Sequence, residues 1–320
     1  MMRRASVLMA CLTVLSAGCS GKRNPRDLLA PREVGTIIVD GRLIVGQLEP
    51  DIFLRTTQSP SEPYHRDAAA LHGARALVFT DSGDTLFYRE SFAEGGRYFA
   101  YDMTPGFRAV LPNTTYHLRV EATDGRIVTA ETTTPARFTV RDWLLLDDSG
   151  QTVRHRLATY GDFSNDPDSV YLVASNQLVY QDGLLEARFD RANAIGYQVG
   201  IYSLDEDSPT VIDADFLSEH DLANLARNTS SPTFDAPDGF LRLPWFAIFF
   251  EGRYQINIYS VDRNWYDLTR STDFFGNNNI GFGTNAGDDF ERPIFHINGG
   301  IGFFGSASYS SAGFTVLPRP

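Results

Sequence analysis

After residue 33 the chain consists mainly of short runs in which apolar and polar residues alternate. In the run from Tyr116 to Ala122 every second residue is apolar, and the residues between them are His117, Arg119 and Glu121. A period of two is typical of an antiparallel strand with one face in the core and the other in water. The pattern therefore predicts half-buried strands.

Turn residues separate these runs. The turn sequences at residues 81–84 and 123–126 both contain Asp and Gly, and each is flanked by two apolar, strand-like runs. Such spacing predicts two β-hairpins, over residues 76–88 and 116–134. Further strands are predicted at residues 36–40, 184–190 and 194–201.

Two tyrosines occupy matching places in the two halves of the chain. The segments 112–120 and 252–258, which contain Tyr116 and Tyr254, resemble the strand that carries the tyrosine corner in immunoglobulin-like and fibronectin type III domains. We therefore expect an all-β chain of two immunoglobulin/fibronectin type III-like β-sandwich domains. The N-terminal Ig-like sandwich would span residues 34–140, and the C-terminal fibronectin-like sandwich residues 141–320.

One helix is predicted as an insertion into the second domain, near residues 218–227. Ser218 and Asp221 have the spacing of a capping box, and the flanking Leu217 and Leu222 that of a hydrophobic staple. We expect this short insertion to close one end of the sandwich.

A Gly/aromatic-rich C-terminal extension is expected beyond residue 273. Its glycines at positions 300, 302 and 305 spell G-x-G-x-x-G. A dinucleotide site needs a strand before this loop and a helix after it. Here a strand-like segment, residues 313–317, follows instead, so the motif does not indicate nucleotide binding.

The first residues have the pattern of an export signal. Arg3 and Arg4 precede an apolar run from Ala5 to Leu15, which is shorter than the roughly 20 residues of a membrane span. The run ends in Leu15-Ser16-Ala17-Gly18-Cys19, which resembles a bacterial lipobox. The alternative is an ordinary cleaved secretion signal. We expect a lipoprotein signal peptide over residues 1–18, lipid attachment at Cys19 and a tether over residues 19–33.

Charge and cysteine content exclude several classes of function. The chain has a net charge of −12, and without residues 1–18 it has 26 basic and 40 acidic residues, a net charge of −14. Nucleic-acid binding requires basic surfaces, so we expect no nucleic-acid partner. Cys11 lies in the signal and Cys19 is the lipid site. The mature chain therefore has no thiol for a disulfide, a zinc cluster or a nucleophile.

Several segments together resemble the uncharacterised lipoprotein family called domain of unknown function 4249. They are residues 38–41, 116–135, 254–262 and 298–305. The resemblance implies a cell-envelope lipoprotein of a kind often found with outer-membrane nutrient receptors of the TonB-dependent class. It implies no catalytic residue.

The best candidate for ligand binding is the cluster Asp262, Asn264, Trp265 and Tyr266. An aromatic ring among polar groups can stack on a sugar or contact a peptide while its neighbours form hydrogen bonds. The alternative is that these aromatic residues cover the edge of the core.

Metal binding and hydrolysis are weaker hypotheses. Pairs of acids such as Asp166 with Asp168 could supply some calcium ligands, but no EF-hand loop occurs, and solvated turn acids are the alternative. The six histidines are scattered, and neither G-x-S-x-G nor H-E-x-x-H is present. We therefore expect no metal site, no cofactor and no enzyme activity.

The sequence thus favours a non-catalytic lipoprotein. Ser20 rather than aspartate follows Cys19, which by analogy with known lipoprotein sorting rules favours the outer membrane as the place of the anchor. It would be an accessory or binding component of a nutrient-uptake system, with an outer-membrane receptor protein and a glycan or peptide ligand as expected partners. The alternatives are a structural or adhesive envelope protein and, third, a secreted hydrolase.

Overall fold

The computed structural model describes residues 34–59, 62–101, 109–191, 194–212, 225–243, 245–271 and 295–320. The chain is mostly β, with 48% strand and 11% helix, which confirms the predicted β-rich fold. Lipid attachment at Cys19 and most of the predicted helical insertion lie outside the described residues. Of that insertion, residues 225–227 are described, and they are not helical.

The first seven strands and one short helix come from residues 37–133. They are β1 (Ile37–Ile44), β2 (Ile52–Thr56), α3 (Arg66–Ala69), β3 (Arg75–Thr80), β4 (Thr85–Glu90), β5 (Arg97–Tyr101), β6 (Thr115–Glu121) and β7 (Ile127–Thr133). Both hairpins predicted from the turn sequences are present, as β3 with β4 and β6 with β7. We call this part, with its core, the N-terminal lobe.

The remaining elements form the C-terminal lobe, except that residues 297–307 pair with strands of the N-terminal lobe. The strands are β8 (Val140–Leu146), β9 (Val153–Arg156), β10 (Gln177–Val179), β11 (Leu184–Phe189), β12 (Gly196–Ser203), β13 (Asn228–Ser230), β14 (Phe240–Leu243), β15 (Gly252–Val261), β16 (Ile297–Asn298) and β17 (Ile301–Leu317). The helical elements are η1 (Tyr160–Phe163), η2 (Pro167–Tyr171), η3 (Ala174–Asn176), η4 (Trp245–Ala247) and α5 (Arg263–Ser271).

The described strands form two sheets. A mixed 13-stranded sheet has the order β13-β12-β15-β17-β1-β2-β5-β4-β3-β6-β7-β16, with β10 also paired to β17. A four-stranded antiparallel sheet has the order β14-β11-β8-β9. The inward residues of β11 and β14 pack with those of β12 and β15 in one hydrophobic core, so the two sheets face each other in the C-terminal lobe.

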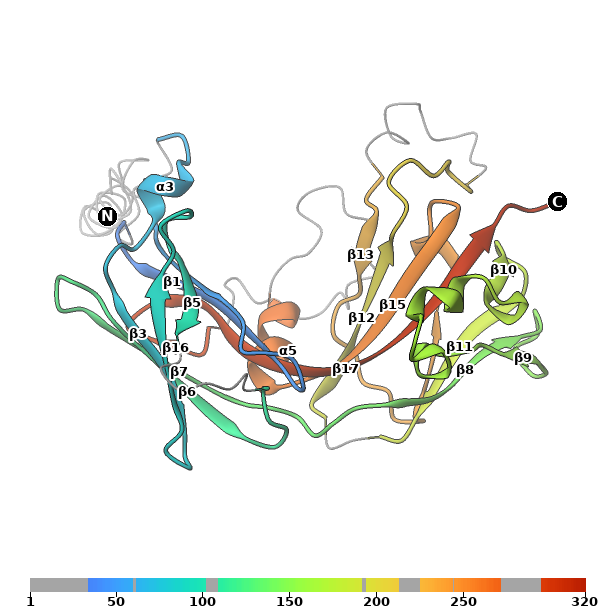
Figure 1. Ribbon diagram of the computed structural model, residues 1–320, viewed down its shortest axis with the longest axis horizontal. Helices are drawn as coiled ribbons and strands as arrows, with labels where there is room; N and C mark the ends of the chain where they lie inside the picture. Colours follow the sequence, from blue (N-terminus) through green and yellow to red (C-terminus); the bar gives the residue numbers. More distant parts are fainter. Residues whose placement is uncertain are drawn as a thin grey trace, which may run out of the picture.

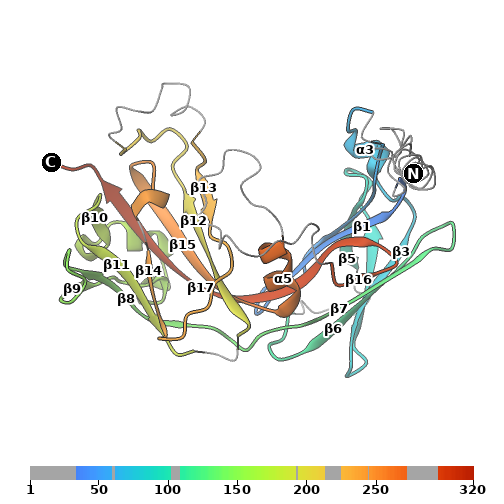
Figure 2. The ribbon, with the colours of Figure 1, turned by 180° about the vertical axis from the view of Figure 1, so that it is seen from behind.

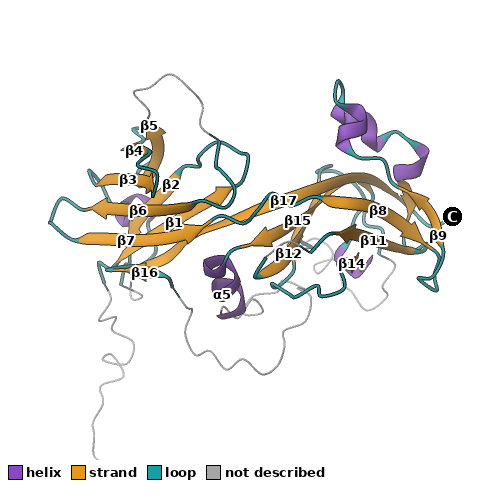
Figure 3. Ribbon diagram, turned by 90° about the horizontal axis from the view of Figure 1, so that it is seen from below, coloured by secondary structure: helices purple, strands orange, loops and turns teal. Residues whose placement is uncertain are grey.

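Strand β17 belongs to both lobes (Figures 1 and 2). Its first half pairs in parallel with β1, and its second half pairs in antiparallel with β15. Phe304 packs into the N-terminal core, whereas Phe314 packs into the C-terminal core. Seen from below, the strands of the two lobes are joined through β17 (Figure 3). The sequence suggested that this segment is an extension, but it is a central strand, because its alternating apolar residues complete two cores.

The glycines before and within β17 allow backbones to approach closely. Gly302 has a φ of 112°, and a Cβ atom there would lie 2.1 Å from the carbonyl oxygen of Val39. A Cβ on Gly300 would lie 2.6 Å from the carbonyl oxygen of Ile37. A strand rather than a helix follows these glycines, as the sequence indicated. The motif thus lets the start of β17 approach β1 closely.

Both predicted tyrosine corners have the expected hydrogen bond. The backbone N–H of Leu111 donates to the hydroxyl oxygen of Tyr116 at 2.8 Å, and that of Phe250 donates to Tyr254 at 2.9 Å. Both rings are almost fully buried. Each lobe therefore fixes, by the same hydrogen bond, the loop before the strand that carries this tyrosine, β6 in one lobe and β15 in the other.

Candidate functional site

The predicted ligand cluster forms the start of helix α5. Asp262 directly precedes the helix, and its Oδ1 accepts a hydrogen bond from the backbone N–H of Trp265 at 2.9 Å. This is the contact of an N-cap residue, which satisfies a backbone donor that has no partner within the helix. The sequence pattern did not predict this helix, because its apolar residues are few.

The same residues connect the two lobes. The Thr132 hydroxyl in β7 donates to Oδ2 of Asp262 and lies 2.8 Å from the Ser306 hydroxyl in β17. The side-chain amide of Asn264 donates to the carbonyl oxygens of Glu131 and Phe304, at 2.6 and 2.8 Å. Burial raises the pKa of Asp262, although the hydrogen bonds that its carboxylate accepts from the Thr132 hydroxyl and the Trp265 backbone N–H oppose the shift. Asp262 and Asn264 therefore join α5, β7 and β17.

The aromatic members of the cluster also have partners within the protein. The indole of Trp265 stacks on Tyr259 at 5.9 Å, contacts Phe303 edge to face at 5.4 Å, and donates from Nε1 to Gln198 at 2.7 Å. The ring of Tyr266 lies over Gly196. These contacts favour the alternative in which the aromatic residues cover the sheet. Ligand binding by this cluster stays a prediction.

Polar side chains continue from Trp265 along the sheet face opposite the C-terminal core. Asn257 donates to the hydroxyl of Tyr259 at 2.9 Å and accepts from Gln255 at 2.8 Å. The hydroxyls of Tyr202 and Tyr259 lie 3.0 Å apart. Since these groups satisfy one another, the row orders β12 and β15 without an added ligand.

A different surface stands out in the N-terminal lobe, on the face of its sheet that points away from the core. We call it the aromatic face. It consists of Leu77, Phe79, Phe87, Arg89, Phe99 and Tyr101.

The strand register brings the aromatic face together. Phe87 lies directly opposite Leu77 on one side and Tyr101 on the other, and Arg89 lies opposite Phe99. The side chain of Phe87 is 46% exposed and that of Tyr101 is 41% exposed. Contiguous exposed apolar side chains of this kind are typical of interaction surfaces.

The charge of the aromatic face is positive. The guanidinium of Arg89 lies 5.0 Å from the ring centre of Tyr101 and 5.8 Å from that of Phe99, and it has no ion pair with a described acid. Beside it, Arg75 and Arg119 share the single carboxylate of Glu121, at 3.9 and 2.8 Å. Asp81 and Glu131 also lie nearby, next to His117, so the positive charge of the aromatic face itself is that of Arg89.

The aromatic face was not predicted from the sequence. The sequence predicted the hairpin of residues 76–88, but it assigned no face to Phe87 or Arg89 and did not place them beside Phe99 and Tyr101. An available signal was the presence of large aromatic residues at alternate positions of β3, β4 and β5, although the sequence had predicted only the first two of these strands. Register across strands, which the sequence alone does not give, turns these positions into one patch.

The hypotheses of a metal site and of hydrolysis gain no geometric support. Among the described residues, no three His, Cys, Asp or Glu side chains gather at metal-binding distance. His72, His117 and His296 each lie within 2.8 Å of one carboxylate oxygen, in three separate places on the surface. These pairs order exposed loops and strands, and enzyme activity stays untested.

No helix in the described ranges is long and apolar enough to cross a membrane.

The chain belongs to the family described as domain of unknown function (DUF4249), whose model matches residues 27–312. This confirms the resemblance found in the sequence. No curated protein matches the chain.

Proposed function

We propose that this member of the DUF4249 family is a non-catalytic lipoprotein that binds a protein partner at the outer membrane, as an accessory or binding component of a nutrient-uptake system. The anchor is Cys19, and the contact surface is the aromatic face. The family resemblance leads us to propose an outer-membrane receptor of the TonB-dependent class as the partner. The single observation that carries the proposal is the exposed aromatic face with Arg89, which has no ion pair with a described acid.

The composition of this face supports a protein contact. Aromatic side chains and arginine are enriched in protein interfaces and supply most of their binding energy. Arg89 is held over two rings, so its side chain is already ordered before a partner arrives, which lowers the entropy cost of binding. A carboxylate of the partner would accept hydrogen bonds from the N–H groups of this guanidinium.

The fold also supports an origin from two related units. We propose that each lobe derives from an immunoglobulin-like or fibronectin type III-like sandwich, because each has its own core and its own tyrosine-corner hydrogen bond. In this interpretation β17 joined the two units into one sheet, and the boundary between them lies near residue 140.

A photo-cross-linking experiment in the native membrane tests the proposed contact. A photoreactive phenylalanine analogue is introduced at position 87 and, as a control, at position 153 in β9. Phe87 and Val153 have nearly equal exposure, 46% and 44%. We expect a discrete adduct with a membrane protein from position 87 only. The same adduct from both positions, or none from either, would contradict the proposal.

The partner identified in this way is then purified for a binding measurement. We expect Arg89→Glu to weaken its binding at least tenfold, because the charge that faces the partner's acid is reversed. Arg126→Glu, on a turn away from the aromatic face, serves as the control and should leave the affinity within twofold. Equal affinity of wild type and Arg89→Glu would remove the aromatic face from the contact.

Membrane anchoring has its own test. Cys19→Ala should move the protein from the membrane fraction to the soluble fraction, since several acyl chains are needed for stable attachment. Retention of this variant in the membrane would contradict the lipoprotein assignment. If the adduct from position 87 instead contains a second copy of this chain, the structural or adhesive alternative is favoured.

A further inference from the structure

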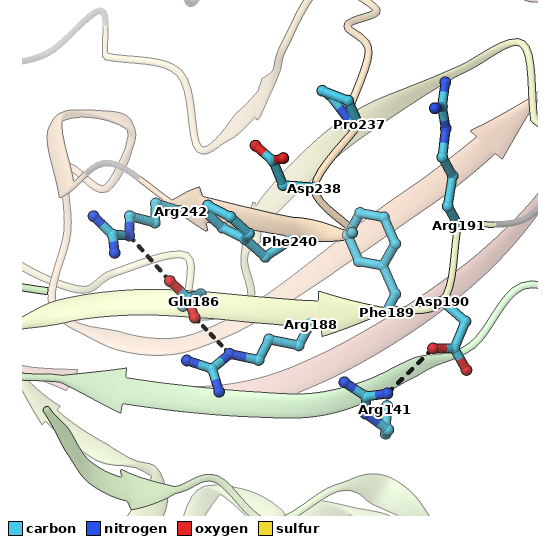
Figure 4. A pocket seen from close by; sticks show the side chains of 11 residues that line it. Arg141, Glu186, Arg188, Phe189, Asp190, Arg191, Pro237, Asp238, Phe240 and Arg242 are labelled. Atoms are coloured by element: carbon cyan, nitrogen blue, oxygen red, sulfur yellow. Dashed lines mark hydrogen bonds and ion pairs between the residues drawn. The ribbon is translucent and has the colours of Figure 1, made fainter. Parts of the chain in front are cut away.

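The outer face of the four-stranded sheet contains a cavity of about 550 Å³. Its lining includes Arg141, Glu186, Arg188, Arg191, Phe240 and Arg242 (Figure 4). Cavities of this size accommodate small organic ligands. The cavity is remote from the aromatic face, because it lies on the other lobe.

Glu186 organises the floor of this cavity. It lies on β11 directly opposite Arg242 of β14, two residues before Arg188 on the same strand. Its side chain is 3% exposed, and its two oxygens accept hydrogen bonds from Nε of Arg188 at 2.7 Å and from Nε of Arg242 at 3.0 Å. The buried acid thus fixes the orientation of two arginines.

Arg188 remains able to bind a further acceptor. It contacts Glu186 through Nε, and its two terminal nitrogens have no acceptor among the described residues. Arg242 differs, because its NH2 group donates to the carbonyl oxygen of Gly150 at 2.7 Å. A guanidinium with free terminal nitrogens on an ordered side chain is well suited to a planar carboxylate.

The rim of the cavity contains two further arginines whose acid partners a ligand could displace. Arg141 pairs with Asp190, and Arg191 pairs with Asp235, both at 3.1 Å. The side chains of both acids are mostly exposed, at 90% and 60%. Exposed ion pairs of this kind contribute little to stability. An anion in the cavity could therefore replace either acid at little cost.

The lining also limits the charge and shape of the ligand. Four arginines and three acids line the cavity, and Asp235 and Asp142 beside it pair with Arg191 and Arg141, so the arginines carry no excess positive charge over the acids around them. A dianion such as phosphate would therefore meet more repulsion from these acids than a single carboxylate. Phe240 is 39% exposed and supplies an apolar wall for the rest of the ligand.

We propose that this cavity binds a small monocarboxylate with an apolar or aromatic body, with Arg188 as the residue that contacts the carboxylate and Glu186 as the residue that positions Arg188.

Titration calorimetry on the full-length protein in detergent tests the site with three probes. Benzoate has the required carboxylate and ring, benzamide has the same shape without charge, and inorganic phosphate is a dianion near pH 8. We expect benzoate to bind at least tenfold more tightly than either of the others. No benzoate binding, equal binding of benzamide, or tighter binding of phosphate would overturn the proposal.

Variants of Arg188 then assign the contact. Arg188→Ala and Arg188→Gln should each reduce benzoate affinity at least tenfold, and Arg188→Lys should reduce it less, because lysine keeps the charge but not the fork. Arg154→Ala, in the same sheet but outside the cavity, should bind like wild type. Thermal melts identify any variant that fails to fold. Unchanged affinity in folded Arg188→Gln would overturn the assignment.

Discussion

The two lobes use arginine and aromatic residues differently on their outward sheet faces. In the N-terminal lobe, Arg89 lies over the rings of Phe99 and Tyr101 on an exposed face and has no acid partner in the described residues. In the C-terminal lobe, Glu186 is buried beneath Arg188 and Arg242 and fixes both by ion pairs, and a cavity lies above them.

This difference connects local chemistry with the kind of ligand. An open aromatic face with an unneutralised arginine fits a large, acidic partner surface, because the contact can extend over several strands. A cavity whose charge is nearly balanced fits a small molecule of low charge. Arginine and aromatic residues thus support recognition of a protein surface in one lobe and of a small molecule in the other. The buried Glu186 beneath Arg188 and Arg242 makes the difference.

The largest effect is expected from Gly302→Ala, which tests whether the two lobes are independent. The substitution places a Cβ against the Val39 carbonyl at a φ of 112°, so we expect a loss of about 3 kcal/mol or more in the free energy of unfolding. Gly35→Ala is the matched control, because Gly35 also has a positive φ, 84°, but its Cβ would meet nothing within 4 Å. Its loss should be near 1 kcal/mol.

Tryptophan fluorescence shows whether this damage crosses between the lobes. Trp143 and Trp245 are buried in the C-terminal core, whereas Gly302 lies beside β1 in the N-terminal lobe. The third tryptophan, Trp265, contacts Phe303 next to Gly302, so Trp265→Phe is introduced into both proteins for this measurement. Since β17 is shared, we expect Gly302→Ala to lower the melting temperature recorded by tryptophan as well. An unchanged tryptophan transition, together with a lost N-terminal lobe, would show that the lobes fold separately.

A smaller effect is expected from Glu186→Ala, which tests the difference between the two outward faces directly. Loss of two charge-assisted hydrogen bonds should cost about 1–3 kcal/mol, and no more, because Arg188 and Arg242 are half-exposed and can be hydrated. The matched variant is Glu121→Ala beside the aromatic face, where the ion pairs are exposed and the loss should be below about 1 kcal/mol. Equal losses, measured by denaturant unfolding, would contradict the distinction.

Much of the fold could be predicted from alternation and turn sequences. The strand around Tyr116, its hairpin partner and both tyrosine corners follow from local patterns, because a half-buried strand needs a period of two. The place of β17 could not be predicted in this way. Its pairing with β1 joins residues about 260 positions apart, and no local pattern encodes such a register.

The candidate site was less predictable, for a related reason. Trp265 was correctly identified as an aromatic residue among polar neighbours, but its partners Gln198 and Phe303 lie on other strands. Sequence spacing cannot show whether those partners already satisfy it. The opposite holds for Arg89, whose isolation from acids becomes visible only when the neighbouring strands are in place.

The smallest effect concerns Asp262, which belongs to both lobes. Burial raises the pKa of Asp262 above its ordinary value of 3.8, so the folded protein binds this proton more tightly than the unfolded chain. Stability from this group is therefore greatest below about pH 3.8 and is lost as the pH rises through the folded pKa. Asp262→Asn removes this dependence of the free energy of unfolding on pH, because asparagine does not titrate. It keeps an acceptor for the Trp265 N–H, so its stability at pH 7 should stay within about 1 kcal/mol of wild type.

Denaturant unfolding of wild type and Asp262→Asn from pH 3.5 to pH 7 measures this slope as a difference. Asp205 contributes a slope of opposite sign, because its hydrogen bonds from Arg253 lower its pKa, but this contribution is present in both proteins and cancels. We expect the stability of wild type relative to the variant to fall as the pH rises. A constant difference would mean that the pKa of Asp262 is the same in the folded and unfolded states, and a difference that rises with pH would mean that folding lowers this pKa. The carboxylate would then stabilise the junction between the lobes through its hydrogen bonds more than its burial destabilises it.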